Sequence, residues 1–233
     1  MKEIIVKNVA SYSIPFQDII MLNVDLEYPA IICKHMHKQC KDKTFNTYYK
    51  KRILELSDYS IKKLYPSATQ EYEFRLEEDF PFSPYFLENN YLVKYLNYPI
   101  ISLYMDKYEF TGGAHGMTFR DSQTWNLNYG KRLTLSQLFK KNYSYKKVIL
   151  QEIKKQAHER EDSKADIYFD HLDESIERYY DPKNYYLTDK GIVIYYPLYT
   201  IAPYSEGIQE FVIPYSMFNG NILYEIGKSI WDK

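Results

Sequence analysis

A cluster of glycines near the middle of the chain constrains the fold more than any other feature. Three of the eight glycines in 233 residues lie between Thr111 and Gly116, in the run Thr-Gly-Gly-Ala-His-Gly. Glycine reaches positive φ angles at no steric cost and marks places where two backbones approach closely. Strand-like sequence precedes the cluster over Pro99–Phe110 and follows it over Met117–Leu127. The pattern predicts a tight turn between two strands, with the imidazole of His115 at its apex.

The remainder of the chain reads as strands, a helix, strands, helices and strands. Further strands are expected at Ile4–Val9, Phe16–Tyr28, Glu71–Leu76, Tyr91–Tyr95 and Gln209–Ile213, with a hairpin at Asn184–Tyr196. Helical spacing predicts helices at Asn46–Leu64 (ended by Pro66), Tyr145–Arg160 and Ile167–Tyr179, a weak terminal helix within Tyr215–Ile230, and one turn capped by Thr134.

This order favours an α+β fold over a regular βαβ alternation. We predict mixed, mainly antiparallel sheets packed with two main helices. A soft boundary near Asn128 divides an N-terminal β-α-β companion domain, residues 1–128, from a C-terminal helix-plus-hairpin domain, residues 129–233. The two are expected to associate closely or to form one unit.

Composition and sequence patterns exclude several classes of function. The formal net charge of −1 and the pI near 6.5 do not predict nucleic-acid binding, which needs a net basic field. There is no apolar run of 18 residues, so no membrane span is expected, and the charged N-terminus does not read as a signal peptide. No cofactor motif is found. The 27 tyrosines suit half-buried sheet faces and contact surfaces.

His115 is the strongest catalytic candidate. An imidazole in a glycine turn can serve as acid, base or metal ligand, and Asp106 and Asp121 are nearby carboxylates that could orient it. The alternative is that Gly112, Gly113, His115 and Gly116 form a structural corner in which the imidazole bonds the backbone. No nucleophile or second ligand has diagnostic spacing, so we expect no catalytic site; if the chain is an enzyme, these three residues carry the chemistry.

A second candidate is the run Cys33-x-His35-x-His37-x-x-Cys40. Sulfur and imidazole suit zinc, and Cys33, His35 and His37 would share one face of a strand. The spacing matches no standard structural zinc module, so we expect no metal here. The two cysteines would form a small disulfide loop outside the cell or remain free thiols inside it.

Four tyrosines near the C-terminal hairpin are binding candidates. Tyr195, Tyr196, Tyr199 and Tyr204 could form an aromatic patch for a glycan or a protein, since tyrosine buries area at interfaces with little loss of entropy. The alternative is that these rings cover a sheet.

Several ordered motifs resemble one bacterial domain family of undefined general function. They are Tyr108-x-x-Thr111-Gly-Gly-Ala-His-Gly116, Asn126-Leu127-x-x-Gly130-Lys131-x-Leu133-Thr134-Leu135-x-x-Leu138-Phe139, Tyr185-Tyr186-Leu187-Thr188-x-x-Gly191 with the five residues after it, and Tyr199-x-Ile201-Ala202-Pro203-Tyr204-Ser205-x-Gly207. The family includes the outer domain of the lysozyme-sensing, sigma-V-type anti-sigma factor and an N-terminal accessory domain of some peptidoglycan deacetylases. The N-terminal half resembles the companion domain that usually precedes it.

The resemblance implies a binding or sensing module of a cell-envelope or stress-response kind. Its expected ligand is a lysozyme, another envelope protein or cell-wall glycan. It implies a place outside the cytoplasm, whereas the sequence shows no signal peptide or anchor, so a cytoplasmic location stays open. The competing hypothesis is a small hydrolase acting on envelope glycan through His115.

Overall fold

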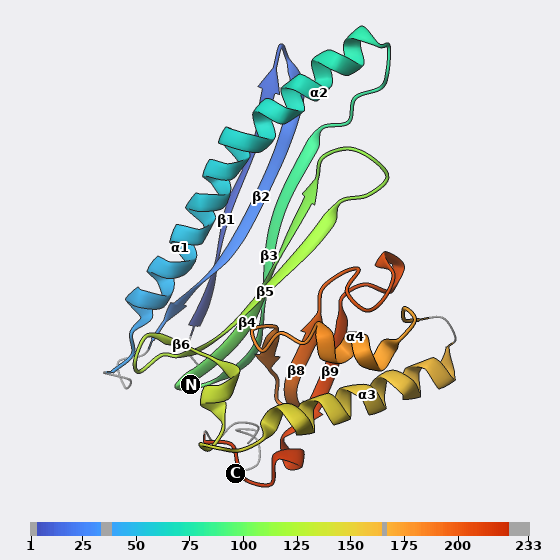
Figure 1. Cartoon of the computed structure of the whole chain (residues 1–233). Coiled ribbons are helices and arrows are strands. Elements are labelled where there is room, and N and C mark those ends of the chain that lie inside the picture. Colours follow the sequence, from blue (N-terminus) through green and yellow to red (C-terminus); the bar gives the residue numbers. More distant parts are fainter. Residues whose placement is uncertain (1–3, 34–38, 165–166, 224–233) are drawn as a thin grey trace. The chain divides into compact units, whose positions relative to one another are not determined.

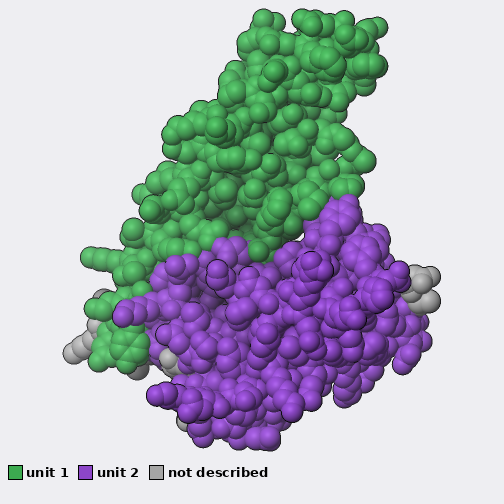
Figure 2. Space-filling model, in the orientation of Figure 1, with its two compact units in different colours: residues 1–92, 105–120, 127–130 green, residues 93–104, 121–126, 131–233 purple. Residues whose placement is uncertain are grey.

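The computed structural model describes residues 4–33, 39–164 and 167–223 (Figure 1). The fold is α+β with mixed, mainly antiparallel sheets, as the sequence predicts. One sheet has the strand order β1-β2-β3-β4-β5-β6 and the other β7-β8-β9. The chain forms two compact units (Figure 2). Unit 1 comprises residues 1–92, 105–120 and 127–130, and unit 2 comprises residues 93–104, 121–126 and 131–233.

The larger sheet begins with a long hairpin. β1 (Ile4–Phe16) and β2 (Ile19–Ile32) pair antiparallel, and β2 pairs parallel with β3 (Tyr85–Asn97). A parallel pair needs a crossover connection, which the long helix between these two strands supplies. The remaining strands of this sheet are β4 (Ile100–Phe110), β5 (Met117–Asn126) and β6 (Lys131–Leu133).

The helical crossover is longer than the sequence suggests. α1 (Asp42–Tyr59) continues through a π-helical turn at Ser60–Leu64 into α2 (Tyr65–Glu77). The wide turn lets the Tyr65 N–H donate to the Ser60 carbonyl, and Pro66 then falls in the first turn of α2, where its missing N–H costs nothing. The prediction that Pro66 ends the helix is therefore wrong.

The strand predicted at Glu71–Leu76 is also wrong, because this segment lies in α2. Its alternating pattern arises from apolar residues that the helix leaves in solvent: Phe74 is 55% and Leu76 65% exposed. A period of two indicates a strand only when one side of the pattern is buried. Sequence alone does not reveal which apolar side chains are covered.

The core of unit 1 lies between the helix and β2. Alternate β2 residues Leu22, Val24 and Leu26 are buried, and α1 buries Phe45, Tyr49 and Ile53. The rings of Phe45 and Tyr49 lie 4.6 Å apart.

Unit 2 combines helices with a three-stranded antiparallel sheet. Its elements are α3 (Tyr145–Ser163), α4 (Leu172–Arg178), β7 (Tyr185–Leu187), β8 (Gly191–Tyr196) and β9 (Gln209–Pro214). The predicted hairpin is confirmed, as is the single turn after Thr134, a 3-10 helix at Leu135–Leu138 with a capping box. The helix expected from Ile167 begins only at Leu172.

Every residue of β8 is buried, because both faces of its sheet are covered. Ile192, Ile194 and Tyr196 belong to the main core with α3, whereas Val193 and Tyr195 pack in a second cluster with Tyr104 and Tyr186. A strand covered on both faces reads as a continuous apolar run rather than an alternation, which is the pattern of β8.

The C-terminal segment forms a 3-10 turn at Tyr215–Phe218. The weak helix predicted within Tyr215–Ile230 does not continue through residues 219–223, where Asn219 has a φ of 48° and Ile222 forms an isolated bridge with Phe139. Its remainder, residues 224–230, lies outside the described residues. Within the described ranges, none of the helices combines the length and apolar character required to cross a membrane.

Candidate functional site

The glycine turn joins β4 to β5 and combines two different demands on glycine. Gly112 and Gly113 have φ angles of 92° and 85°, which side-chain-bearing residues rarely adopt. Gly116 is needed for space instead: a Cβ there would lie 2.5 Å from the carbonyl oxygen of Glu109 and 2.6 Å from Cζ of Tyr108. The turn is therefore a corner at which the backbone and a tyrosine ring come into direct contact.

His115 bonds the backbone of this corner. Its side chain is exposed, and Nδ1 lies 3.0 Å from the carbonyl oxygen of Gly116. The N–H of Gly116 donates to the hydroxyl of Tyr108 at 3.2 Å. These contacts support the structural interpretation of the glycine cluster, in which imidazole and phenol together hold the turn.

The carboxylates proposed to assist His115 are engaged elsewhere. Arg120 donates through Nε to Oδ1 of Asp106 at 2.8 Å and through Nη2 to Oδ2 at 2.7 Å. Asp121 accepts a 3.1 Å hydrogen bond from Gln123, and it belongs to unit 2, whereas His115 and Asp106 belong to unit 1.

Sequence reasoning missed Arg120, although a signal was present. Positions 106 and 120 lie seven residues on either side of Gly113. In a hairpin turning about that glycine, the two residues would face each other across the strands, where opposite charges attract.

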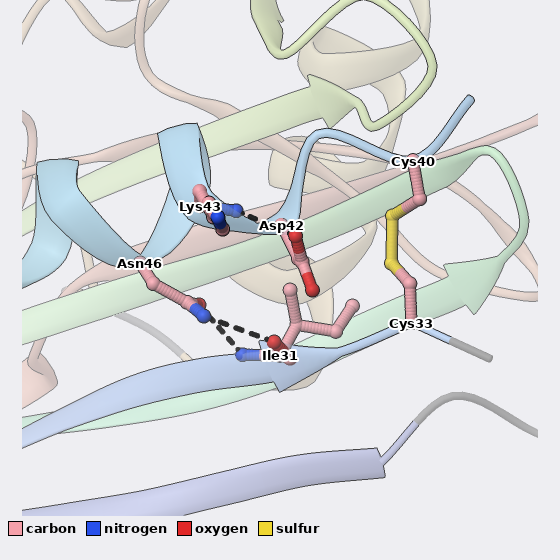
Figure 3. The surroundings of a disulfide bond; sticks show 6 residues. All are labelled: Ile31, Cys33, Cys40, Asp42, Lys43 and Asn46. Carbon is pink, nitrogen blue, oxygen red and sulfur yellow. Dashed lines mark hydrogen bonds between the residues drawn. A yellow bond between two sulfur atoms is a disulfide. The ribbon is translucent and has the colours of Figure 1, made fainter. Parts of the chain in front are cut away.

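The two cysteines are joined in a disulfide, Cys33–Cys40, with a Cα–Cα distance of 6.3 Å. It links the segment after β2 to the segment before α1 (Figure 3). Close by, the side chain of Asn46 on α1 binds the backbone of Ile31 at the end of β2. Its Oδ1 accepts a hydrogen bond from the N–H of Ile31 at 2.8 Å, and its Nδ2 donates one to the Ile31 carbonyl at 3.0 Å.

The pairing leaves neither sulfur as a thiolate, the form that binds metals. The other two candidate ligands, His35 and His37, lie outside the described residues. Among the residues that are described, no group of three or more His, Cys, Asp or Glu side chains could hold a metal ion.

The four candidate tyrosines divide into two pairs. Tyr195 and Tyr196 are 2% and 1% exposed on β8, which leaves them no surface to offer a ligand. Tyr199 is 50% exposed and Tyr204 is half-buried, and their ring centroids lie 5.5 Å apart. The structure therefore reduces the aromatic patch to Tyr199 and Tyr204.

The loop that carries this pair is anchored at several points. Ile201 and Ala202, which lie between the two tyrosines in the sequence, are buried. The Ile201 carbonyl accepts a hydrogen bond from the N–H of Phe169 at 3.0 Å. Lys164 binds the Glu206 carboxylate at 2.8 and 2.9 Å.

Tyr199 itself has a φ of 60°, an unusual conformation for a bulky residue. Backbone held in a sparsely populated region costs energy and persists only where surrounding contacts enforce it. The loop thus carries two aromatic rings, 5.5 Å apart between centroids, on an anchored backbone.

Two family models match the chain in separate segments. One, described as a protein of unknown function (DUF3298), matches residues 136–216, and the other, described as the deacetylase PdaC, matches residues 18–118. The resemblance drawn from the motifs is thus confirmed at the level of these two domain families. No curated protein matches the chain.

Two solved structures show the same fold. A DUF3298 family member from Bacteroides fragilis is 17% identical, covers 95% of this chain and 93% of its own, and superposes with a TM-score of 0.67. A DUF3298 family protein from Pseudomonas aeruginosa is 19% identical, covers 94% and 93%, and has a TM-score of 0.59. At these identities the likeness shows the fold alone.

Proposed function

We propose that the chain is a non-catalytic binding module of the bacterial cell envelope. Its ligand, a protein such as a lysozyme or a cell-wall glycan, contacts Tyr199 and Tyr204. The observation that carries this proposal is the accessible ring pair on an anchored loop.

Tyrosine is suited to such a contact for physical reasons. Its ring buries a large area at a small cost in side-chain entropy, and its hydroxyl can bond a polar ligand at the same time. A loop that already holds its rings in place loses little further freedom on binding. The positive φ of Tyr199 agrees with this role, because strained residues cluster at ligand sites.

Location and ligand class are supported by separate observations. A structural disulfide such as Cys33–Cys40 persists in oxidising compartments, which favours a place outside the cytoplasm. The motif resemblance to the lysozyme-sensing anti-sigma ectodomain supports lysozyme, and the match to a model named after a deacetylase is consistent with a glycan-rich setting.

The competing hypothesis of a hydrolase draws less support. A catalytic imidazole needs an orienting group within hydrogen-bond reach. Nδ1 of His115 lies at the Gly116 carbonyl, and Arg120 occupies both carboxylate oxygens of Asp106.

Isothermal titration of the chain with hen egg-white lysozyme, and separately with an oligomer of N-acetylglucosamine, tests the proposal. One of them should bind, and Tyr199→Ala or Tyr204→Ala should weaken that binding about tenfold or more. The matched control is Tyr129→Ala, since Tyr129 is 71% exposed in unit 1 and should not affect affinity. Absence of heat with both ligands, together with a peptidoglycan-hydrolysing activity that His115→Ala abolishes, would reverse the assignment.

A further inference from the structure

One end of unit 1 exposes five large apolar side chains. The exposed fractions are 43% for Ile19, 42% for Ile20, 55% for Phe74, 65% for Leu76 and 57% for Phe80. They come from the start of β2, the end of α2 and the loop after α2, which lie together in unit 1 (Figure 1). We call residues 15–20 and 71–84 the α2 end.

The α2 end is held together by specific contacts. The ring of Tyr72 contacts those of Phe16 and Phe82, with centroid distances of 6.5 and 5.4 Å. Arg75 donates to the carbonyl of Pro81 at 3.1 Å, which fastens the loop to the helix. The hydroxyl of Tyr65 donates to the carbonyl of Pro15 at 3.2 Å, which fastens the hairpin. The exposed residues are thus borne on a defined scaffold.

The exposed apolar residues of α2, Phe74 and Leu76, are unusual for the solvent side of a packed helix. The helix buries Leu64 and Ala68, and its solvent side would ordinarily be polar. Single exposed apolar residues are common and need no explanation. Five large ones at one end of one unit are instead typical of a surface that contacts another molecule.

The charge of the α2 end indicates what kind of molecule would bind there. The α2 end carries the six carboxylates of Asp18, Glu71, Glu73, Glu77, Glu78 and Asp79. The one basic residue there is Arg75, whose Nε bonds Glu71 at 2.6 Å. The formal charge of this end is therefore −5, whereas the whole chain has −1.

The negative charge of the α2 end favours partners with a positively charged surface. A second copy would bring two acidic ends together, and an anionic lipid surface would also be repelled. A basic surface would gain attraction from the carboxylates and bury Phe74, Leu76 and Phe80.

We propose that the α2 end is a docking surface for a protein that presents basic side chains around an apolar patch. The charged residues set the sign and the rate of encounter, and the aromatic and aliphatic side chains supply most of the contact. This inference does not depend on the proposed function, because Tyr199 and Tyr204 belong to unit 2.

Site-specific photo-cross-linking in cells that produce the chain is the first test. The probe is benzoylphenylalanine placed at Phe74 or at Leu76, and the control position is Leu54, which is 58% exposed on α1 of the same unit. We expect one protein adduct at both test positions and not at the control, with a pI above about 9. An acidic partner, a second copy of the chain, a lipid adduct, or no yield above the Leu54 level would overturn the proposal.

Titration with the purified cross-linked protein is the second test. The double variant Glu73→Lys/Glu77→Lys and the single variant Leu76→Ser should each bind about tenfold more weakly or worse. Wild-type affinity should fall between about 50 and about 500 mM NaCl. The matched control is Glu55→Lys/Asp58→Lys on exposed positions of α1.

Equal losses in the control and the test variant, or unchanged binding in the test variant, would contradict the proposed surface. All of these positions are solvent-exposed, so circular dichroism and the unfolding temperature should match those of the wild type.

Discussion

The guanidinium of Arg120 binds both carboxylate oxygens of Asp106, at 2.8 and 2.7 Å. Asp106 lies on β4 and Arg120 on β5, so the pair ties together the two strands that the glycine turn connects. Their side chains are 25% and 9% exposed. A residue that the sequence suggested as a catalytic helper is thus part of the structure that holds the hairpin.

Arg120→Ala should lower the free energy of unfolding by about 2 kcal/mol, because it leaves a partly buried carboxylate without its partner. Urea unfolding measures the change. Lys51→Ala is the matched control: its 3.7 Å pair with Glu55 is exposed, and its loss should cost less than about 0.5 kcal/mol. Equal costs for the two variants would show that the Arg120 pair contributes no more than a surface pair.

Gly116→Ala should destabilise the chain by about 2 kcal/mol, because the new methyl group would overlap the carbonyl oxygen of Glu109. His115→Ala should cost about 1 kcal/mol, the value of a single hydrogen bond. Thermal unfolding of both variants checks the order. A larger cost at His115 would mean that the imidazole does more in this corner than bond Gly116.

Two tyrosines with buried hydroxyls should respond differently to loss of that hydroxyl. The hydroxyl of Tyr196 donates to the Ile176 carbonyl at 2.9 Å, so Tyr196→Phe should cost about 1 kcal/mol. The buried hydroxyl of Tyr180 has no hydrogen-bond partner among the described residues, and burial raises its pKa. Tyr180→Phe should therefore leave stability unchanged or raise it. Chemical unfolding distinguishes the two; a cost at Tyr180 would reveal an unseen partner.

Replacing both Cys33 and Cys40 by serine should lower the free energy of unfolding by roughly 2 kcal/mol, because the unfolded chain is then no longer cross-linked. The same loss should appear when the wild type is treated with reductant and compared by calorimetry. If reductant changes the wild type but not the double variant, the disulfide accounts for the effect. No change in either protein would mean that the cross-link adds nothing to stability.

The pH dependence of stability should have a contribution from His158 on α3. Hydrogen bonding to Asp173 raises its pKa, with a further bond to Glu161. A raised pKa stabilises the folded state below the unfolded pKa of 6.5, and this gain is lost as pH rises through the folded value. The imidazole is 54% exposed, so the effect is well under about 1 kcal/mol. The wild type should exceed His158→Gln in unfolding temperature at pH 5.5 and match it at pH 8.5; a constant difference would contradict this.

Short-range patterns predicted most elements correctly. The hairpin of β7 and β8, α3 and the capped turn after Thr134 follow from side-chain periodicity and local capping, which a few neighbouring residues set. The failures at Pro66 and Glu71–Leu76 share one cause. The π-helical turn at Ser60–Leu64 places Pro66 in the first turn of α2, where proline is tolerated, and Phe74 and Leu76 of α2 remain exposed to solvent. Neither outcome is visible in a local pattern.

The sequence by itself determined that the chain turns sharply at Gly112 and Gly113, because a positive φ there requires glycine. It also determined the α+β class and the motifs that resemble the two matched domain families, which are local in the chain. Only the tertiary structure decided which candidate residues are accessible. Burial depends on contacts between distant segments, and these contacts place Tyr195 and Tyr196 in the core and leave Tyr199 and Tyr204 accessible. The pairing of the two strands likewise brings Asp106 to Arg120.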